Sequence, residues 1–554
     1  MPKRRDFLKT LAGAALAGTC LPLAPVVFPN AAFAWTDAAP GDAETLYNGI
    51  VLSKPWPPER TTLPRDPVEP AYLAQPPNVI PIDLGRQLFV DDFLIAQTTL
   101  KRTYHQAKYF DQNPVLKPDR PWEMTEPNPT AMVFSDGVWF DPRDKLFKMW
   151  YMAGYVAGTG YATSKDGIRW EKPELDVIAG TNLVQKGRRD SGTVWIDDRA
   201  DDPNQRYKMV LWTGGALDLF TSADGIHWNK AQRTGETGDR TTMFYNPFRK
   251  RWIYSLRAGI EGDPRVRRYW EAEDFVAGAN WKELGDAALW TSADNLDPQR
   301  TDLKTRPQLY NLDCAAYESI LLGLFTIWRG QPSDRAKPNE VCLGFSRDGF
   351  HWSRPDRRPF IPVSERHGDW NWGNVQSAGG GCLVLGDTLY FYCSGRAGIR
   401  GSSSSGVCST GLATLRRDGF ASMDAADSEG KLTTRPVRFS GKHLFVNADA
   451  DEGELRVEAL GGDGTVIAPL SRDQCRPIRT DSTLQEVQWS GAKDLAPLAG
   501  KPVAFRFALR RGSLFSFWIS PDSKGASGGY VAAGGPAFSG PTDSVGRAAS
   551  RPER

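Results

Sequence analysis

The chain has 554 residues, enough for two or more domains, and its 68 Lys plus Arg nearly balance its 66 Asp plus Glu, giving a formal net charge of +2. No basic excess is present, so nucleic acid is not an expected partner. With five His and no Cys-x-x-Cys pair among seven Cys, a zinc site is not expected either. The 19 Trp and 16 Tyr are numerous, and large flat rings suit sugars as well as cores.

The first 34 residues have the pattern of an export signal. Arg4-Arg5 open a basic stretch, an Ala-rich apolar run follows, and Ala32-Phe33-Ala34 is a small-x-small cleavage site. This pattern is typical of bacterial twin-arginine export, so we expect the twin-arginine export machinery as a partner and a periplasmic or secreted mature protein. The apolar run is too short for a good membrane span, and no other stretch is apolar enough to span.

Residues 35–81 are rich in proline and are predicted to form an extended, irregular arm. From residue 82 the pattern changes to short strands of alternating or aromatic-rich residues, separated by Asp, Gly, Asn and Pro turns. Long amphipathic helical patterns are nearly absent, so the chain is predicted to be all-β.

One ten-residue phrase recurs within this region. The stretch "YATSKDGIRW" (161–170) returns as "LFTSADGIHW" (219–228) and as "LGFSRDGFHW" (343–352). A worn copy is present in "TLRRDGF" (414–420). The Asp-Gly pair is typical of a tight turn between two strands, which gives the phrase a structural rather than a catalytic role.

The spacing of the phrase predicts the architecture. The gap between the second and third copies has room for one more, and 268–275 and 289–296 are rival candidates for it. Five copies at a mean step of about 63 residues predict a five-bladed β-propeller over 82–432. Longer alternating strands then predict a C-terminal β-sandwich over 433–533. The Gly/Ser/Pro/Arg-rich stretch 534–554 is expected to be disordered.

The first strand of each propeller blade lines a central channel, so side chains at the starts of these strands are candidates for a site. Segments similar to one another place first strands in five successive blades. The candidate channel residues are Asp136, Asp190, Asp239, Arg240, Asp313, Glu318, Asn374 and Gln376.

Five blades, a carboxylate-lined channel and a trailing sandwich resemble the five-bladed propeller glycoside hydrolases of families 32, 68, 43 and 62. Arg189-Asp190 is similar to the Arg-Asp-Pro motif of those enzymes, although Ser191 stands where proline would. Three segments, "LFVDDFLI", "FSRDGFHW" and "RPVRFSGKHLFVN", also resemble segments of exported bacterial proteins that are described as glycosyl hydrolases. The resemblance covers about 82–521 in architecture.

The resemblance implies a glycoside hydrolase acting on an oligo- or polysaccharide, since cleavage of a glycosidic bond needs one protonated and one ionised carboxyl. It implies Asp136 as base or nucleophile and Asp190 as a stabilising carboxylate that Arg189 keeps ionised. It implies Glu318 as the acid, although the family takes its Glu from an earlier blade. Further candidates are Asp239, Arg240 and Asp313 around the substrate, Asp91 and Asp92 as rivals in blade one, and Trp370, Trp372 and Asn374 as a stacking wall.

Two other functions stay open at this point. A non-catalytic carbohydrate-binding propeller would keep the tryptophans but would need no acid/base pair. A sialidase-like enzyme is a third hypothesis, because Ser-x-Asp-Gly-x-x-Trp is similar to the Asp box, which normally has one more residue before the Trp. No cofactor motif is visible, and a structural Ca²⁺ held by channel carboxylates is compatible with the sequence.

Overall fold

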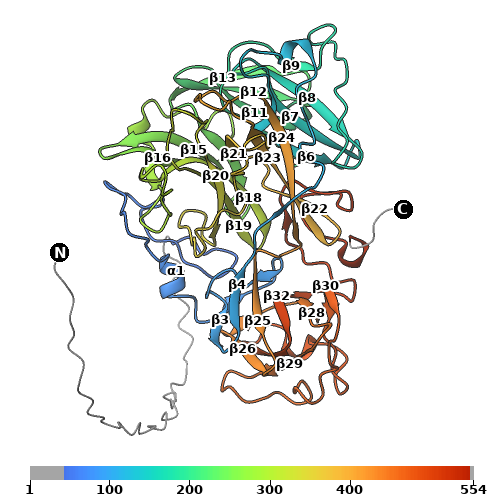
Figure 1. The fold of residues 1–554 in the computed structure, drawn as a ribbon. Coiled ribbons are helices and arrows are strands. Elements are labelled where there is room, and N and C mark those ends of the chain that lie inside the picture. Colours follow the sequence, from blue (N-terminus) through green and yellow to red (C-terminus); the bar gives the residue numbers. More distant parts are fainter. Residues whose placement is uncertain (1–42, 550–554) are drawn as a thin grey trace, which may run out of the picture. The chain divides into compact units, whose positions relative to one another are not determined.

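The computed structural model of the protein describes residues 43–549, and the predicted export signal at 1–34 lies outside them (Figure 1). The described chain is built almost entirely of strands, with α1 (Ala71–Ala74) as its one α-helix, so the predicted all-β class is confirmed. Between residues 43 and 549 no helix is long and apolar enough to cross a membrane. The short 3-10 helices are η1 (Pro121–Glu123), η2 (Pro203–Gln205), η3 (Leu284–Asp286), η4 (Ala496–Leu498) and η5 (Gly546–Ala548).

Five antiparallel sheets follow one another along the chain. The first contains β6 (Ala131–Asp141), β7 (Leu146–Ala153), β8 (Gly158–Ser164) and β9 (Leu183–Gln185). The second contains β10 (Gly192–Ile196), β11 (Tyr207–Trp212), β12 (Ala216–Ser222) and β13 (Asn229–Glu236), and the third β14 (Thr242–Asn246), β15 (Arg251–Ile260), β16 (Asp263–Ala272) and β17 (Ala288–Thr291). The fourth contains β18 (Gln308–Glu318), β19 (Ile320–Trp328), β20 (Glu340–Ser346) and β33 (Tyr530–Val531). The fifth contains β21 (Asn374–Ser377), β22 (Leu383–Leu385), β23 (Thr388–Arg396), β24 (Cys408–Arg416) and β5 (Lys108–Tyr109).

The first strands of these sheets contact one another in a closed ring. In order around the ring, β6 contacts β10, β10 contacts β14, β14 contacts β18, β18 contacts β21, and β21 returns to β6. Apolar side chains from neighbouring sheets fill the space between them in one large buried cluster. Side chains at the two ends of these five strands are therefore brought to a common axis.

The repeated phrase forms the turn that follows the third strand of a sheet. In the first copy, the Ser164 hydroxyl accepts from the Gly167 N–H at 2.9 Å, and Asp166 Oδ1 accepts from the N–H groups of residues 168 and 169 at 2.8 Å. The copies at 222–225 and 346–349 repeat these bonds. Gly167 has φ of 73°, a region that favours glycine, so the phrase has the structural role that its composition predicted.

Each of these turns is also bonded to the preceding sheet of the ring. The Tyr392 hydroxyl of the fifth sheet donates to the Gly167 carbonyl of the first at 2.5 Å. Trp150 of the first sheet donates to the Gly225 carbonyl of the second at 2.7 Å. Trp290 of the third donates to the Phe350 carbonyl of the fourth at 2.7 Å. The phrase therefore connects neighbouring sheets as well as turning the chain.

The structure decides between the two degenerate copies. Asp274, at the end of the 268–275 segment, follows the third strand β16 and accepts from the N–H groups of residues 276 and 277 at 2.8 and 2.6 Å, as in the clear copies. The worn copy at 414–420 differs from them, because Asp418 has φ of 60° and turns its carboxylate into the protein interior.

Two further sheets share a separate core. One contains β2 (Gln87–Leu88), β4 (Lys101–Tyr104), β25 (Ala421–Ala425), β28 (His443–Asp449), β30 (Asp481–Glu486) and β32 (Gly512–Ser520). The other contains β3 (Ile95–Thr98), β26 (Gly430–Thr434), β29 (Glu454–Leu460) and β31 (Ala504–Arg510), and a parallel pair joins β1 (Ile80–Pro81) to β27 (Val437–Arg438). Their apolar faces meet in one buried cluster rich in phenylalanine.

The segment boundaries in the structure differ from those predicted. Residues 87–104, expected in the propeller, supply strands to the two further sheets. At the other end of the chain, disorder was expected from residue 534, yet Phe538 and Asp543 are buried. Patterns in a single sequence do not predict these boundaries, because the pairing of distant segments does not depend on adjacent residues. The six cysteines between residues 43 and 549 are buried and free, so none of them forms a disulfide.

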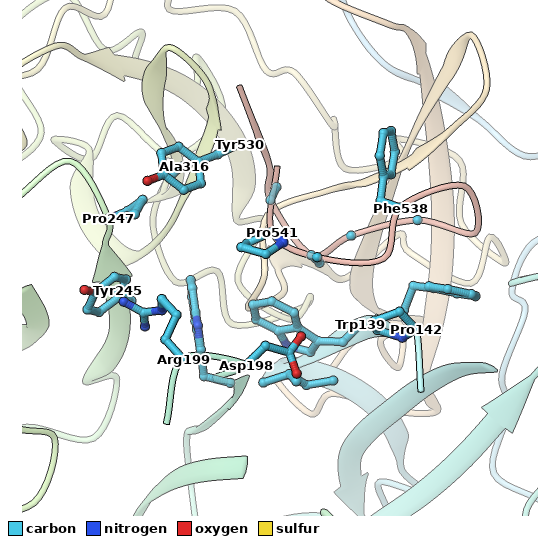
Figure 2. A pocket seen from close by; sticks show the side chains of 18 residues that line it. Trp139, Pro142, Asp198, Arg199, Tyr245, Pro247, Ala316, Tyr530, Phe538 and Pro541 are labelled. Carbon is cyan, nitrogen blue, oxygen red and sulfur yellow. The ribbon is translucent and has the colours of Figure 1, made fainter. Parts of the chain in front are cut away.

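The C-terminal segment 530–541 covers one end of the ring. Ala533 accepts from the Phe140 N–H at 3.0 Å and donates to the Cys382 carbonyl at 2.9 Å, which connects the segment to the first and fifth sheets. Figure 2 shows the pocket that this arrangement leaves, between Trp139, Tyr245, Tyr530 and Pro541. We call this the covered end of the ring.

A buried ion network stands beside the covered end. Glu318, at the end of β18, lies 3.1 Å from Arg417 and 3.5 Å from Arg86, and Arg417 also lies 2.9 Å from Asp543. Asp418 pairs with Arg86 at 3.0 Å and accepts from the hydroxyls of Tyr317 and Ser516 at 2.6 Å. The Arg86 and Arg417 guanidiniums and these hydroxyls hold the pKa of Asp418 at about 2 despite its burial. The network joins the ring, the two-sheet unit and the C-terminal segment.

We expect Asp418→Asn to lower the free energy of unfolding by about 3 to 5 kcal/mol, because it leaves Arg86 buried without a full counter-charge. Denaturant unfolding at neutral pH measures the change. The part of this stabilisation that depends on ionisation of Asp418 is present above the pKa of an unfolded Asp, ~4, and is lost as pH falls toward about 2. The matched control is Asp427→Asn, whose carboxylate is 86% exposed and pairs with Arg511 on the surface. A change there above about 1 kcal/mol, or equal effects of both variants, would contradict the assigned role.

Candidate active site

Charged side chains gather at the other end of the ring, where the first strands begin. Asp136 lies in β6 and Asp313 in β18. Arg189 and Asp190 lie three and two residues before β10, and Arg240 lies two residues before β14. Asp136, Arg189, Arg240 and Asp313 are almost fully buried, and Asp190 is partly buried. The structure therefore brings together five of the residues that the sequence proposed. We call this the open end of the ring, because Asp190, Asp239, Arg265 and Lys337 are partly exposed there.

A bulge in β6 positions Asp136. The pairing register between β6 and β7 jumps from Met132 to Gly137, so residues 133–136 leave the ladder. Phe134 has φ of 47° and Gly137 has φ of 118°, backbone values that L side chains adopt rarely. Bulges of this kind re-aim side chains and are frequent beside active sites.

Asp136 forms an ion pair inside the cluster. Its Oδ1 lies 2.5 Å from a nitrogen of Arg189, while its buried Oδ2 has no hydrogen-bond partner in the protein. Burial raises the pKa of Asp136 to about 6, and the positive charges of Arg189 and Arg240 limit that rise. The sequence led us to predict that Arg189 pairs with Asp190. In the structure, its direct partner is Asp136 instead.

Asp190 has a different environment. Its backbone N–H donates to the Trp212 carbonyl at 2.9 Å, but its buried Oδ1 has no partner, and no cation between residues 43 and 549 lies within 4 Å of the carboxyl group. Burial raises the pKa of Asp190 above its ordinary value, and the charge of Arg240 opposes that shift. Asp136 and Asp190 are both influenced by Arg189 and Arg240, but only Asp136 forms an ion pair in the described part of the chain.

Asp313 is the most heavily hydrogen-bonded carboxyl of the cluster. Its Oδ2 accepts from Ser377 at 2.5 Å, Asn311 at 2.7 Å and Ser135 at 3.3 Å. Burial still raises its pKa, and Oδ1 has no partner. Ser135 also accepts from Arg240 at 2.9 Å, so Asp313 is connected to the arginine through one hydroxyl.

Several residues of the cluster were not predicted from the sequence. They are Ser135, Arg267, Tyr310, Asn311, Lys337 and Arg396. Arg267 is fully buried and donates to the carbonyls of Arg240 and Tyr310. Burial lowers the pKa of Arg267 to about 9. Arg265 and Arg267 are two residues apart in "DPRVRRYW", which predicts that they share one face of a strand. The sequence does not tell whether that face points to the axis of the ring.

Other predicted residues lie at the rim of this end. Asp239 is half exposed and lies 3.7 Å from Arg257. Asn374 donates to the Lys337 carbonyl and accepts from Gln376, both at 2.8 Å. Trp372 is buried beside Arg335, whose guanidinium lies 4.8 Å from its ring.

Four predicted candidates lie elsewhere. Glu318 belongs to the ion network beside the covered end, so it does not lie with Asp136. Trp370 packs over the outer strands of the fifth sheet, against Gly395, Gly411 and Tyr109, so it forms no stacking wall. Asp91 is buried in an ion pair with Arg347 at 2.8 Å, and Asp92 faces solvent beside Arg102.

The cluster, as far as the structure describes it, contains no set of side chains that could bind a metal ion. From residue 43 to residue 549, no group of three or more His, Cys, Asp or Glu side chains is arranged to hold a metal ion. The channel carboxylates alternate with arginines instead, so the calcium ion allowed by the sequence has no all-carboxylate cage here.

Many buried polar atoms of the cluster have no partner within the protein. They include Asp136 Oδ2, Arg189 Nε and Nη1, Asp190 Oδ1, Arg240 Nε and Nη1, Asn311 Oδ1, Asp313 Oδ1, Gln376 Oε1 and Arg396 Nε. Native proteins satisfy nearly all buried polar groups, so a concentration of such atoms indicates a place where water or a polar ligand completes the bonding. Carboxyl groups with perturbed pKa values in the same place indicate acid/base chemistry.

Comparisons with known proteins give distant similarities. No family model and no curated protein matches the sequence. Among solved structures, the chain is similar to an N-acetylgalactosamine deacetylase from F. plautii, with 13% identity, a TM-score of 0.38, and 58% of this chain and 96% of that chain covered. A thermostable family-43 glycoside hydrolase shares 11% identity at a TM-score of 0.35, over 54% of this chain and 94% of that chain. A fructofuranosidase from Schwanniomyces occidentalis shares 12% identity at a TM-score of 0.35, over 75% and 97%. Likenesses of this size carry no argument about the reaction of this chain.

The raised pKa of Asp136 predicts a pH dependence of stability. The unfolded chain releases this proton near pH ~4 and the folded chain near pH 6, so the free energy of unfolding should fall as pH rises through that window, by up to about 3 kcal/mol from this group. In Asp136→Asn this part of the pH dependence should disappear. Denaturant unfolding at pH 4.5 and 7 measures the difference between the two proteins. Identical pH dependence in both would show that Asp136 keeps an ordinary pKa.

Proposed function

We propose that the protein is an exported glycoside hydrolase that cleaves a glycosidic bond at the open end of a five-bladed propeller, with Asp136 and Asp190 as its working carboxyl groups. The observation that carries the proposal is the contrast between these two carboxyls. One is ion-paired with a buried arginine, and the other has no ion-pair partner between residues 43 and 549. Neighbouring carboxyls with different environments are what glycosidic bond cleavage uses.

The environments assign the roles. Arg189 favours the ionised form of Asp136, which suits a base, a nucleophile or a stabiliser of an oxocarbenium-like transition state. Asp190 lacks such a partner and burial favours its protonated form, which suits the general acid. Asp313, fixed by three donors, suits the orientation of the sugar, the role that the sequence predicted for Asp190, while Asp190 takes the acid role predicted for Glu318.

The surroundings suit a sugar. The side chains of Tyr310 and Trp328 are mostly buried, and the Arg265 guanidinium lies 5.6 and 4.7 Å from the centres of their rings. The ring of five sheets supports the five-bladed propeller, and the two sheets that share a core support the sandwich, as do the motifs that resemble the propeller glycoside hydrolases. Export rests on the twin-arginine pattern of residues 1–34. A binding-only propeller would have no need for two buried carboxyls with different charge partners.

We expect Asp136→Asn and Asp190→Asn each to reduce kcat/KM by on the order of 10²-fold or more, because each removes either the charge or the proton that the transition state requires. A glycan library screen with product analysis identifies a substrate, and the variants are then assayed on it. Their thermal melts should show a folded protein, since Asn is nearly isosteric with Asp.

Two control variants make this test specific. Asp166→Asn alters a surface turn and should leave kcat/KM within about twofold, because Asn also caps such turns. Glu318→Gln should alter stability through the ion network and leave the pH–rate profile unchanged. Near-full activity of Asp190→Asn, or a changed pH–rate profile in Glu318→Gln, would contradict the assigned site.

A further inference from the structure

Three cations surround the ring of Tyr310 at the open end. The Arg240 guanidinium lies 5.9 Å from the centre of the ring, the Arg265 guanidinium 5.6 Å and the Lys337 ammonium 4.9 Å. Lys337 also donates to the Tyr310 hydroxyl at 3.0 Å. Arg240 is buried beneath this group, while Arg265 and Lys337 are partly exposed. We call these four residues the Tyr310 cluster.

Within residues 43–549, none of the three cations has a carboxylate within 4 Å. Buried arginines elsewhere in the same chain do have one: Arg347 pairs with Asp91, Arg354 with Asp297, and Arg206 with Asp141. Most buried arginines of the described chain are therefore paired, whereas Arg240 of the Tyr310 cluster, like Arg267 and Arg396, has no carboxylate within 4 Å. Because no carboxylate pairs directly with these three cations, an anion that arrives from outside would form charge-assisted hydrogen bonds with them and reduce their mutual repulsion.

The donors needed for an anion are present. Arg240 donates to Ser135 through one nitrogen, and its Nε and Nη1 have no partner in the protein. Arg265 donates to Gln308 at 2.5 Å, and its guanidinium also lies 4.7 Å from the centre of the Trp328 ring. A planar guanidinium matches a carboxylate in shape and in its two parallel hydrogen bonds.

We propose that the substrate is an acidic sugar, and that its carboxylate binds among Arg240, Arg265 and Lys337 over the ring of Tyr310. This inference rests on the proposed function, because it places the anion beside the carboxyls that would cleave the glycosidic bond. Ser135 connects the two parts of the site, since it bonds to Arg240 and directly precedes Asp136 in β6. Burial raises the pKa of Asp190 more than the charge of Arg240 lowers it, so the net shift is upward.

The test compares each acidic sugar with its own uncharged form. Oligosaccharides of galacturonic, glucuronic and mannuronic acid are titrated against the full protein by calorimetry, each beside its methyl ester. The ester removes only the charge. We expect at least one acid to bind about 10-fold or more tightly than its ester, with a preference that weakens as salt is raised, because charge-assisted hydrogen bonds are screened at a partly exposed site.

Variants assign that preference to residues. Lys337→Gln and Arg265→Gln should each weaken binding of the acid about 10-fold and leave binding of the ester unchanged, whereas Lys337→Arg should keep most of the preference. The matched controls are Lys230→Gln and Arg233→Gln, which remove partly exposed cations that pair with Asp218 in the second sheet, and both should behave as the unmodified protein. Lys337 and Arg265 are partly exposed, so their variants are expected to fold, and thermal melts check this.

The outcomes separate the two proposals. Equal binding of acid and ester, tighter binding of esters, or no binding of any acid overturns the inference, whatever the hydrolysis assay shows. Inorganic sulfate that binds as tightly as the acidic sugars also overturns it, because the site would then recognise an anion without a sugar. If acids bind selectively but no glycosidic bond is cleaved, the acid selectivity stands and the proposed hydrolase function falls. If neutral glycans are cleaved without acid preference, the hydrolase stands and the acidic substrate falls.

Discussion

Closing five first strands into a ring forces the charged side chains at the starts of these strands into a small space that solvent barely reaches. Desolvation is the largest influence on every carboxyl there, and it raises the pKa values of Asp136, Asp190 and Asp313 together. Arg189 is the arginine that opposes the shift most at Asp136, whereas Arg240 is that arginine at Asp190 and Asp313. The differences among these carboxyls, which acid/base chemistry needs, arise from the arrangement of arginines around them.

The two ends of the ring differ in how their buried charged side chains are paired. Beside the covered end, Arg417 lies between Glu318 and Asp543, and the opposed charges are complete within the protein. At the open end, by contrast, Arg240 and Asp190 have no ion-pair partner within 4 Å among residues 43–549; buried nitrogen atoms without a hydrogen-bond partner occur at both ends, on Arg240 as well as on Arg86 and Arg417. A complete network stabilises one conformation and joins segments, whereas an incomplete one favours a polar ligand. This asymmetry, more than the ring itself, distinguishes the end where chemistry is proposed.

The C-terminal segment explains how the asymmetry is maintained. Ala533 is hydrogen-bonded to the first and fifth sheets, and Asp543 contributes to the ion network, so the segment covers one end of the ring with backbone and a charge. The bulge that re-aims Asp136 at the open end occurs in β6, whose last residues contact the same segment. One strand thus carries both the displaced carboxylate and part of the cover.

Local sequence patterns determined the all-β class, the turns of the repeated phrase and the grouping of Asp136, Asp190 and Asp313 on first strands. They did so because alternation and Asp-Gly turns are properties of a few adjacent residues. The place of Glu318 was decided only by the tertiary structure. It lies five residues after Asp313 in β18, which is on the order of 16 Å along a strand and on the opposite face, and the sequence does not say which end of the ring each position reaches.

The same limit applies to partners and to pairing between distant segments. Adjacency in the sequence favoured Arg189 as the partner of Asp190, but the bulge in β6 brings Asp136 to that arginine instead. The strands at 87–104 and the buried segment up to residue 549 owe their positions to contacts with residues hundreds of positions away. Such contacts depend on which buried charges and which strand edges meet in three dimensions. Patterns of adjacent residues in the sequence do not predict them.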